Sequence, residues 1–141
     1  MTFNYEYPRA LNTVDIIVLD NSNRVLLIKR GNEPYKNMWA FPGGFIEMDE
    51  KLVDSAKREL EEETGLQNID LEQFRTYGDP GRDPRGRNIT VVFYGTCSSP
   101  SKIKAGDDAS EAKWFNIDKL PEMAFDHGEV LIYFRKSILE R

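Results

Sequence analysis

Residues 43–66 read GGFIEMDEKLVDSAKRELEEETGL, and this stretch decides the fold. Within it, residues 51–64 contain no glycine or proline and are rich in Glu, Lys, Leu and Ala, a composition that predicts a helix. Gly43 and Gly44 form a turn before this helix, and Gly65 follows at the position where a left-handed C-cap is expected. The chain therefore turns sharply into and out of one helix here.

The acidic residues of this helix are distributed unevenly around its axis. Each helical residue advances by about 100° around the helix axis. With Leu52 set at zero, the apolar residues form a stripe that extends to about 100°. Glu61 falls on the opposite side and fits the usual interpretation of a charge run as a solvated face. Three other carboxylates crowd the border of the apolar stripe: Glu59, Glu62 and Glu63.

This crowding indicates a metal site. Carboxylates three and four residues apart repel one another on a helix, and partial burial raises that cost. A bound divalent cation removes both penalties, and oxygen ligands suit Mg²⁺, with Mn²⁺ as the alternative. Zinc is disfavoured, because His127 is the only histidine and Cys97 the only cysteine. The expected metal ligands are Glu59, Glu62, Glu63 and the carbonyl of Gly44.

Arg58 has two candidate partners in the sequence. Asp54 lies one helical turn before it and would form a favourable pair. Alternatively, Arg58 orients Glu50 at the entrance of the helix, so that both residues support the site. Lys51 is a poor N-cap, and we expect Asp49 or Glu50 to cap the helix instead.

The bulk composition limits the class of protein. A length of 141 residues suits one domain with one core, so we expect residues 1–141 to form a single domain. A net charge of −5 disfavours general binding to nucleic acid. The single cysteine excludes an internal disulfide and fits the reducing cytosol. No secretion signal or apolar run of about 20 residues is present, so a cytoplasmic protein without membrane contact is expected.

The other segments predict several strands and one more helix. Residues 13–20 and 24–30 read as a hairpin, residues 69–76, 89–97 and 111–117 as strands, residues 78–88 as the longest loop, and residues 127–140 as a helix. The residues expected to face inward from this last helix are Val130, Leu131, Phe134 and Ile138, with Tyr133 as a further candidate. The order predicts an α+β chain with a mixed β-sheet between helices, an α/β/α sandwich.

Residues 43–66 resemble the Nudix box, the signature of hydrolases that cleave nucleoside diphosphates linked to another group. All nine defined positions match: Gly44, Glu50, Arg58, Glu59, Leu60, Glu62, Glu63, Gly65 and Leu66. The resemblance implies the Nudix fold and a Mg²⁺-dependent attack of water on a diphosphate phosphorus. By position, Glu59, Glu62 and Glu63 resemble the metal-binding glutamates, and Glu47 is a further candidate ligand. Family members often have Gly at position 49 and Ser or Thr at position 51, where this chain has Asp49 and Lys51.

Two further segments extend the resemblance. YGDPGRDPRGRNITVVFYG (77–95) and EAKWFNIDKLPEMAFDH (111–127) are similar to a branch of Nudix proteins that act on ADP-ribose. This implies hydrolysis of ADP-ribose to AMP and ribose 5-phosphate, and a homodimer. The alternatives are hydrolysis of a damaged nucleoside triphosphate, or a sensor that binds such a ligand without catalysis. Related regulators fuse a Nudix-like domain to a DNA-binding winged helix, and we expect no such second domain in 141 residues.

The identity of the general base stays open. Glu62 and Glu63 are candidates within the resemblance to the Nudix box. Glu111 resembles the distant carboxylate that some Nudix enzymes use as general base or metal ligand. Asp107 and Asp108 compete with it from a polar stretch.

The longest loop carries Arg82, Arg85 and Arg87. A solvated turn would explain them, but beside a metal-phosphate site arginine suits bidentate contacts to a diphosphate. We expect Arg82 or Arg85 to touch substrate, in the partner subunit's site if the dimer forms.

Two aromatic residues, Trp39 and Phe45, flank the glycine pair. Each either belongs to the core or stacks on an adenine ring of the substrate. His127 is expected to cap the last helix, with a substrate contact as the alternative.

Overall fold

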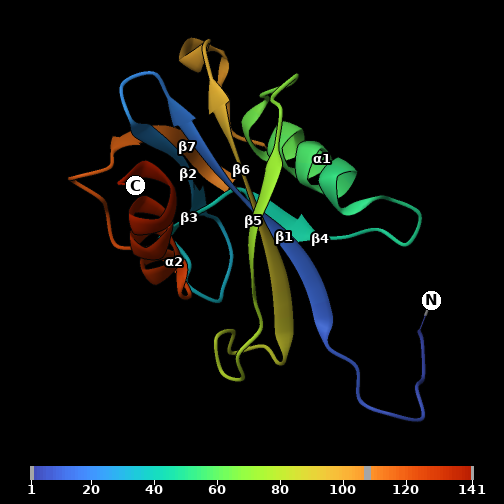
Figure 1. The fold of residues 1–141 in the computed structure, drawn as a ribbon. Coiled ribbons are helices and arrows are strands. Elements are labelled where there is room, and N and C mark those ends of the chain that lie inside the picture. The colour runs from blue at the N-terminus through green and yellow to red at the C-terminus, as the bar shows by residue number, and fades with distance from the viewer. Residues whose placement is uncertain (1, 107–108, 141) are drawn as a thin grey trace.

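The computed structural model describes residues 2–106 and 109–140. They form an α/β/α sandwich whose sheet lies between α1 and α2 (Figure 1). The elements are β1 (Leu11–Asp20), β2 (Arg24–Arg30), β3 (Trp39–Ala40), β4 (Gly43–Phe45), α1 (Leu52–Thr64), β5 (Glu72–Tyr77), β6 (Asn88–Cys97), η1 (Pro100–Lys102), β7 (Ala109–Asn116), α2 (His127–Phe134) and η2 (Arg135–Leu139). The predicted fold class is confirmed.

The sheet is mixed, and β1 is its central strand. The path through the sheet is β3-β2-β1-β6-β5, with β4 pairing to β1 and β7 pairing to β2. β1 runs parallel to β6, while its pairs with β2 and β4 are antiparallel. The expected hairpin of β1 and β2 is confirmed, although the pairing between them is short and β6 is the longer partner of β1.

The alternation of side chains along β1 divides the core into two layers. Val14, Ile16 and Val18 pack toward α1, in a cluster with Ala56 and Leu60. Ile17 and Leu19 pack in a second cluster with three residues of α2: Val130, Leu131 and Phe134. By the same alternation, Thr13 and Asp15 project to the α2 face. They interrupt the apolar run at one end of β1.

The predicted elements differ from the structure mainly at their ends. The strand expected from residue 69 begins at Glu72, because Ile69 packs into the core beside α1. α2 ends at Phe134 and continues as a wider helical turn, η2. Ile138 packs partly buried against the second core cluster, whereas Tyr133 is 40% exposed and does not face inward.

The start of α1 also differs from the prediction. Lys51 is the N-cap residue and provides no side-chain hydrogen bond. Neither Asp49 nor Glu50 takes that role, because Glu50 is held by side chains further along the helix. The end of the helix agrees with the sequence: Gly65 has φ 78°, and its N–H donates to Glu61.

No helix within residues 2–106 and 109–140 is long and apolar enough to cross a membrane.

Candidate active site

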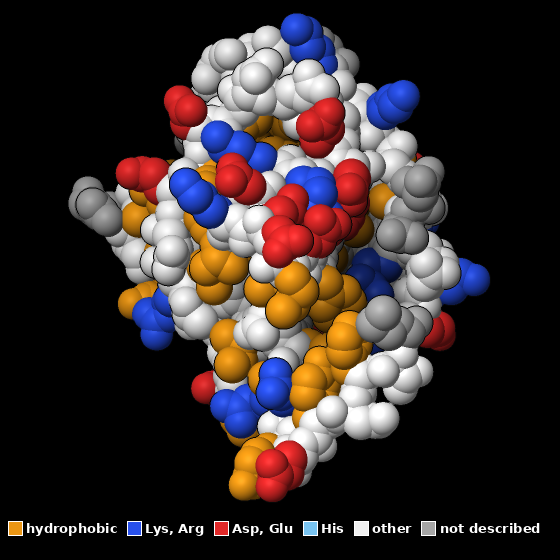
Figure 2. Space-filling view, turned by 90° about the vertical axis from the view of Figure 1, so that its right-hand side faces the viewer, with side chains coloured by type: hydrophobic (Ala, Val, Ile, Leu, Met, Phe, Trp, Pro, Cys, Tyr) orange, Lys and Arg blue, Asp and Glu red, His pale blue; other side chains and the backbone are white. Residues whose placement is uncertain are grey.

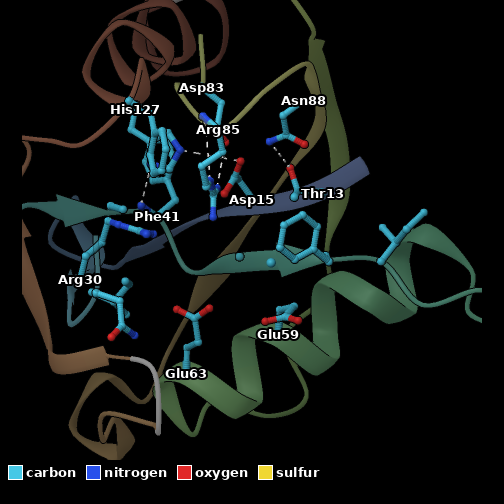
Figure 3. A pocket seen from close by; sticks show the side chains of 18 of the residues that line it. Thr13, Asp15, Arg30, Phe41, Glu59, Glu63, Asp83, Arg85, Asn88 and His127 are labelled. Atoms are coloured by element: carbon cyan, nitrogen blue, oxygen red, sulfur yellow. Dashed lines mark hydrogen bonds and ion pairs between the residues drawn. The ribbon is translucent and has the colours of Figure 1, made fainter. Parts of the chain in front are cut away.

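A cavity of about 480 Å³ is lined by residues of β1, β4, α1, the loop before β6 and the start of α2. Figure 3 shows that its side chains come from both sides of β4, with α1 on one side and β1 and α2 on the other. The site therefore has an acidic side, next to α1, and a second side next to α2.

Two glutamates of α1 form the acidic side. Glu59 and Glu63 point from the helix toward β4 (Figure 3). They lie one turn apart, as the helical spacing predicts. The side chain of Glu59 is only 12% exposed, and Arg58 Nη1 donates to its Oε1 at 2.7 Å. This ion pair offsets part of the cost of burying the carboxylate.

Arg58 holds the entrance of α1 against this acidic pair. Its Nε lies 2.9 Å from both carboxylate oxygens of Glu50, and its Nη2 donates to the carbonyl of Phe45 at 3.1 Å. Burial opposes the charge on Arg58, but the hydrogen bonds to Glu59 and Glu50 outweigh it and raise the pKa of the guanidinium. The hydrogen bond from the Ser55 hydroxyl is the main cause that lowers the pKa of Glu50, and the hydrogen bond from Arg58 lowers it further. Of the two candidate partners of Arg58, the structure shows the contact with Glu50.

The glycine pair of β4 makes room on both sides of the strand. A Cβ on Gly44 would lie 2.5 Å from Glu59 Oε2. A Cβ on Gly43 would collide with Asp15 Oδ1 and with the carbonyl oxygen of Val14. Successive residues of a strand face opposite ways, so each glycine admits one carboxylate.

The predicted arginine loop lies on the α2 side. Arg82 forms a bidentate ion pair with Asp126 at 2.9 and 2.7 Å, and its side chain is only 6% exposed. Arg85 forms a second bidentate pair with Asp83, at 3.1 and 2.8 Å. Both arginines line the cavity of their own chain. Arg82 is held by its partner at the start of α2, whereas Arg85 is 40% exposed and thus better placed to meet a ligand.

Arg85 also lies near two aromatic rings. Its Cζ is 5.8 Å from the ring centre of Phe45 and 5.6 Å from that of Phe125. Phe45 is half exposed, as expected for a residue that could stack on a planar ligand. The hydrogen bonds of Arg85 to Asp83 raise the pKa of Arg85, which favours the charged guanidinium near these two rings.

His127 fastens the start of α2 to the turn between β3 and β4. Its Nδ1 accepts the N–H of Phe41 at 3.1 Å, and the two rings stack with centres 4.8 Å apart. Burial lowers the pKa of His127, which favours the neutral ring. The expected cap is wrong, because Asp126 is the N-cap residue and His127 bonds to the turn instead.

Three predicted site residues lie outside the cavity. Glu62 is 57% exposed and accepts a long bond of 3.4 Å from Arg58. Trp39 packs on Phe115 in the second core cluster, with ring centres 4.7 Å apart, so the core interpretation of Trp39 holds. Glu111 pairs with Lys29 across β7 and β2, at 3.7 Å. The structure does not bring these residues into the cavity.

The other candidates from the sequence are placed as follows. Glu47 lines the cavity, with its carboxylate 3.7 Å from Arg58 and 63% exposed. Arg87 donates to the carbonyl of Gly78 at 2.8 Å and does not line the cavity. Asp107 and Asp108 lie outside the described residues.

Several lining residues were not predicted from the sequence: Thr13, Asp15, Arg30, Asp83, Asn88 and Phe125. The signal that was available is the polar interruption of the apolar strand at Thr13 and Asp15. Asp83 resembled an ordinary turn residue, but its side chain is only 2% exposed because it pairs with Arg85.

The acidic side has the chemistry of a site for a hard cation. Glu59 and Glu63 supply oxygen ligands, and the absence of a side chain on Gly44 lets the Glu59 carboxylate lie against β4. Within the described part of the chain, no three His, Cys, Asp or Glu side chains are already gathered around one point. Figure 2 shows acidic side chains gathered around a basic one on the face that carries α1.

The fold and this cavity define a member of the Nudix class. A family model described as the NUDIX domain matches residues 10–134, and the chain belongs to that family. Nudix hydrolases generally use divalent metal ions such as Mg²⁺.

Particular relatives are similar to most of the chain. It is 42% identical over 114 residues to the ADP-ribose pyrophosphatase of Methanocaldococcus jannaschii, covering 81% of this chain and 67% of that protein. It is 34% identical over 133 residues to the ADPR responsive transcriptional repressor NtrR of Acinetobacter baylyi, covering 89% of this chain and 53% of that protein.

A solved structure is similar over nearly the whole fold. The NUDIX domain of Shewanella oneidensis NrtR, complexed with ADP ribose, superposes with a TM-score of 0.86 at 30% identity. The match covers 94% of this chain and 93% of that domain.

Proposed function

We propose that this chain is a Nudix hydrolase that cleaves the diphosphate of ADP-ribose, giving AMP and ribose 5-phosphate. The observation that carries the proposal is the cavity itself. It combines two helix carboxylates, Glu59 and Glu63, with an arginine that lies near two aromatic rings. A diphosphate linked to a base and a sugar has matching parts, because its phosphates bind metal and arginine while its base stacks. The 42% identity to an ADP-ribose pyrophosphatase supports the same substrate.

The metal ligands in this proposal are Glu59 and Glu63, with the carbonyl of Gly44 and with Glu62 from the solvent side. A bound Mg²⁺ would lower the pKa of a water molecule and neutralise charge on the leaving phosphate. Glu62 could turn toward the others once a cation neutralises their mutual repulsion, since its side chain is mostly exposed. Mn²⁺ has the same oxygen preference and would replace Mg²⁺.

Glu63 is the proposed general base. It points into the cavity from α1, whereas Glu111 is paired with Lys29 outside it. A water oxygen would bond to one phosphorus as the bridging P–O bond breaks, and the carboxylate would accept the proton of that water. Arg58 and Glu50 support this step by fixing the entrance of α1.

The α2 side would bind the rest of the substrate. Arg85 is the proposed phosphate contact, because its guanidinium reaches the cavity while Asp83 fixes its orientation. Phe45, beside it and half exposed, is the proposed stacking partner of the adenine ring.

A panel of substrates tests the proposal. The purified protein would be incubated with Mg²⁺ and ADP-ribose, NADH, a diadenosine polyphosphate or a nucleoside triphosphate, and the nucleotide products would be separated by chromatography and quantified. ADP-ribose is expected to turn over fastest, and chelation by EDTA is expected to stop the reaction. Turnover of triphosphates alone would favour the hydrolysis of damaged nucleotides instead.

A sensor without catalysis is the second candidate, and its support is the similarity to the repressor NtrR. Calorimetry separates the two, because a sensor would bind ADP-ribose with Mg²⁺ present and leave it intact. A homodimer in the cytoplasm belongs to the proposal as well. Light scattering of the purified chain would measure the number of subunits.

A further inference from the structure

Asp15 is a carboxylate at the α2 side of the cavity that the proposed reaction does not use. It lies on β1, directly opposite Gly43 of β4. Its side chain is 13% exposed and lines the cavity (Figure 3). A carboxylate within a largely apolar strand costs free energy unless it has partners, and the charge of Asp15 is attracted by Arg30 and Arg85, which line the same cavity.

One oxygen of this carboxylate is already occupied. Thr90, on the neighbouring strand β6, donates its hydroxyl to Asp15 Oδ2 at 2.6 Å. His127 Nε2 lies 3.8 Å from the same oxygen. Because His127 Nδ1 accepts the N–H of Phe41, the proton of the neutral ring must be on Nε2, which faces Asp15. The neighbours of Oδ2 thus hold the carboxylate in one orientation.

The other oxygen, Oδ1, lies over Gly43, where a side chain would collide with it. Among the described residues, no side chain or backbone N–H donates to Oδ1. A carboxylate oxygen accepts hydrogen bonds and donates none. Oδ1 is therefore an oriented acceptor on the surface of the cavity.

We propose that Asp15 Oδ1 selects the substrate by accepting a hydrogen bond from a neutral donor: the exocyclic amine of the base or a hydroxyl of a ribose. This proposal rests on the proposed function and assigns a contact within its site. A phosphate has no donor to offer and would be repelled by the carboxylate. Asp15 therefore disfavours a phosphate next to Oδ1.

The substitution Asp15→Asn reverses this chemistry with little change in shape. The amide oxygen would still accept the Thr90 hydroxyl, while the amide N–H₂ would lie where Oδ1 was. The cavity would then present a hydrogen-bond donor at the place where the parent protein presents an acceptor. Asp118→Asn is the matched control, since Asp118 is 71% exposed and pairs with Arg135 away from the cavity.

Binding is measured by calorimetry with ADP-ribose and without divalent metal, so that turnover does not enter the result. Asp15→Asn is expected to weaken binding by about 10- to 100-fold, the range for a hydrogen bond to a charged group. Asp118→Asn should bind as the parent protein does. Circular dichroism and a thermal melt establish that each variant is folded.

Two analogues identify the donor. The hypoxanthine analogue of ADP-ribose has an acceptor in place of the exocyclic amine. If the base is the contact, Asp15→Asn will bind this analogue better than the parent protein does. If a ribose hydroxyl is the contact, the parent protein will bind a deoxyribose analogue more weakly than ADP-ribose, and this loss will be larger than in Asp15→Asn, where the hydroxyl can meet only a neutral amide. Either result supports the proposal and identifies the group that donates the hydrogen bond to Asp15.

The contrary results separate this proposal from the proposed function. If Asp15→Asn binds ADP-ribose and both analogues as the parent does, Asp15 has no part in recognition, although the chain still binds ADP-ribose. If the parent protein neither binds nor hydrolyses ADP-ribose, both proposals are overturned together.

Discussion

The two sides of the cavity are built in different ways, although only the strand β4 separates them. The acidic side comes from one continuous stretch, in which Arg58, Glu59 and Glu63 follow one another on a helix. The α2 side is assembled from distant segments: Asp15 and Thr90 are 75 positions apart, and Phe41 and His127 are 86 apart. The first can be read from the spacing of the sequence, whereas the second exists only once the sheet has formed.

The two sides of the cavity also differ in how their charges are balanced. On the acidic side, like charges lie close together, and Arg58 is the cation that offsets them. On the α2 side, the two loop arginines that line the cavity each have a carboxylate, Arg82 with Asp126 and Arg85 with Asp83. One side therefore favours a cation from outside, while the other is already balanced and is suited to orient a ligand.

The largest expected effect comes from removing charge on the acidic side. Glu59→Gln and Glu63→Gln, and also the exposed Glu62→Gln, are expected to lower kcat for ADP-ribose by a factor on the order of 1,000. A metal supplies several kcal/mol of transition-state stabilisation, and each 1.36 kcal/mol is tenfold in rate. The measurement is steady-state turnover with saturating Mg²⁺.

Glu61→Gln is the control for these variants, because Glu61 is an exposed residue of the same helix that bonds to Gln67. It should keep the parent rate. If Glu59→Gln and Glu63→Gln kept it too, the acidic side would not be the catalytic side. The melting temperature of Glu63→Gln should not fall, since the change removes repulsion between neighbouring carboxylates, whereas Glu59→Gln also loses the charge that pairs with Arg58 and should melt at a lower temperature.

A smaller effect is expected from the glycine pair, which tests the two sides with one kind of substitution. Gly44→Ala presses on the end of the Glu59 side chain, so we expect about a tenfold higher Mg²⁺ concentration for half-maximal rate. Gly43→Ala presses on the backbone of Val14 as well as on Asp15, and should destabilise the fold by about 1–3 kcal/mol. Urea unfolding and Mg²⁺ titration of both variants measure the contrast.

The two sides would not differ as described if Gly43→Ala and Gly44→Ala changed stability and Mg²⁺ response to the same degree. Equal loss of stability would mean that β4 cannot move on either side. Equal loss of Mg²⁺ response would mean that Asp15 and Glu59 act on the same metal.

The same contrast explains which features the sequence could predict. The helix of residues 51–64 and the inward direction of Glu59 and Glu63 follow from helical period alone, and both are found. The contact of Trp39 could not be predicted, because a strand of only two residues does not determine which ring its side chain packs against, and in the structure it packs against Phe115. Asp15 was hidden inside an apolar strand.

The role of His127 could not be predicted from the sequence either. A lone histidine before a helix resembles a cap, and only the tertiary structure brings it against Phe41 and Asp15. Glu111 resembled a catalytic carboxylate by its place before an aromatic strand, but the register of β7 on β2 sets it opposite Lys29. Strand register depends on pairing across the sheet, which local spacing does not determine.

The smallest expected effect is a pH dependence of stability from the α2 side. Burial lowers the pKa of His127, so below about pH 6.5 the unfolded chain binds a proton that the folded chain does not. The free energy of unfolding is therefore fully present above that pH and falls as the pH decreases from 7 toward 5.5, by at most about 1.4 kcal/mol per pH unit. Urea unfolding at several pH values measures the slope.

His127→Asn removes the titrating group while the amide oxygen can still accept the N–H of Phe41. Because His127 is the only histidine, the variant should show a flat stability profile between pH 5.5 and 7. Asp20 and Asp83, whose pKa values are lowered in the fold, lose their contributions only at more acid pH, so they do not enter this window. A slope that survived in His127→Asn would show that another group titrates in this window, and that the neutral ring of His127 is not the source of the pH dependence.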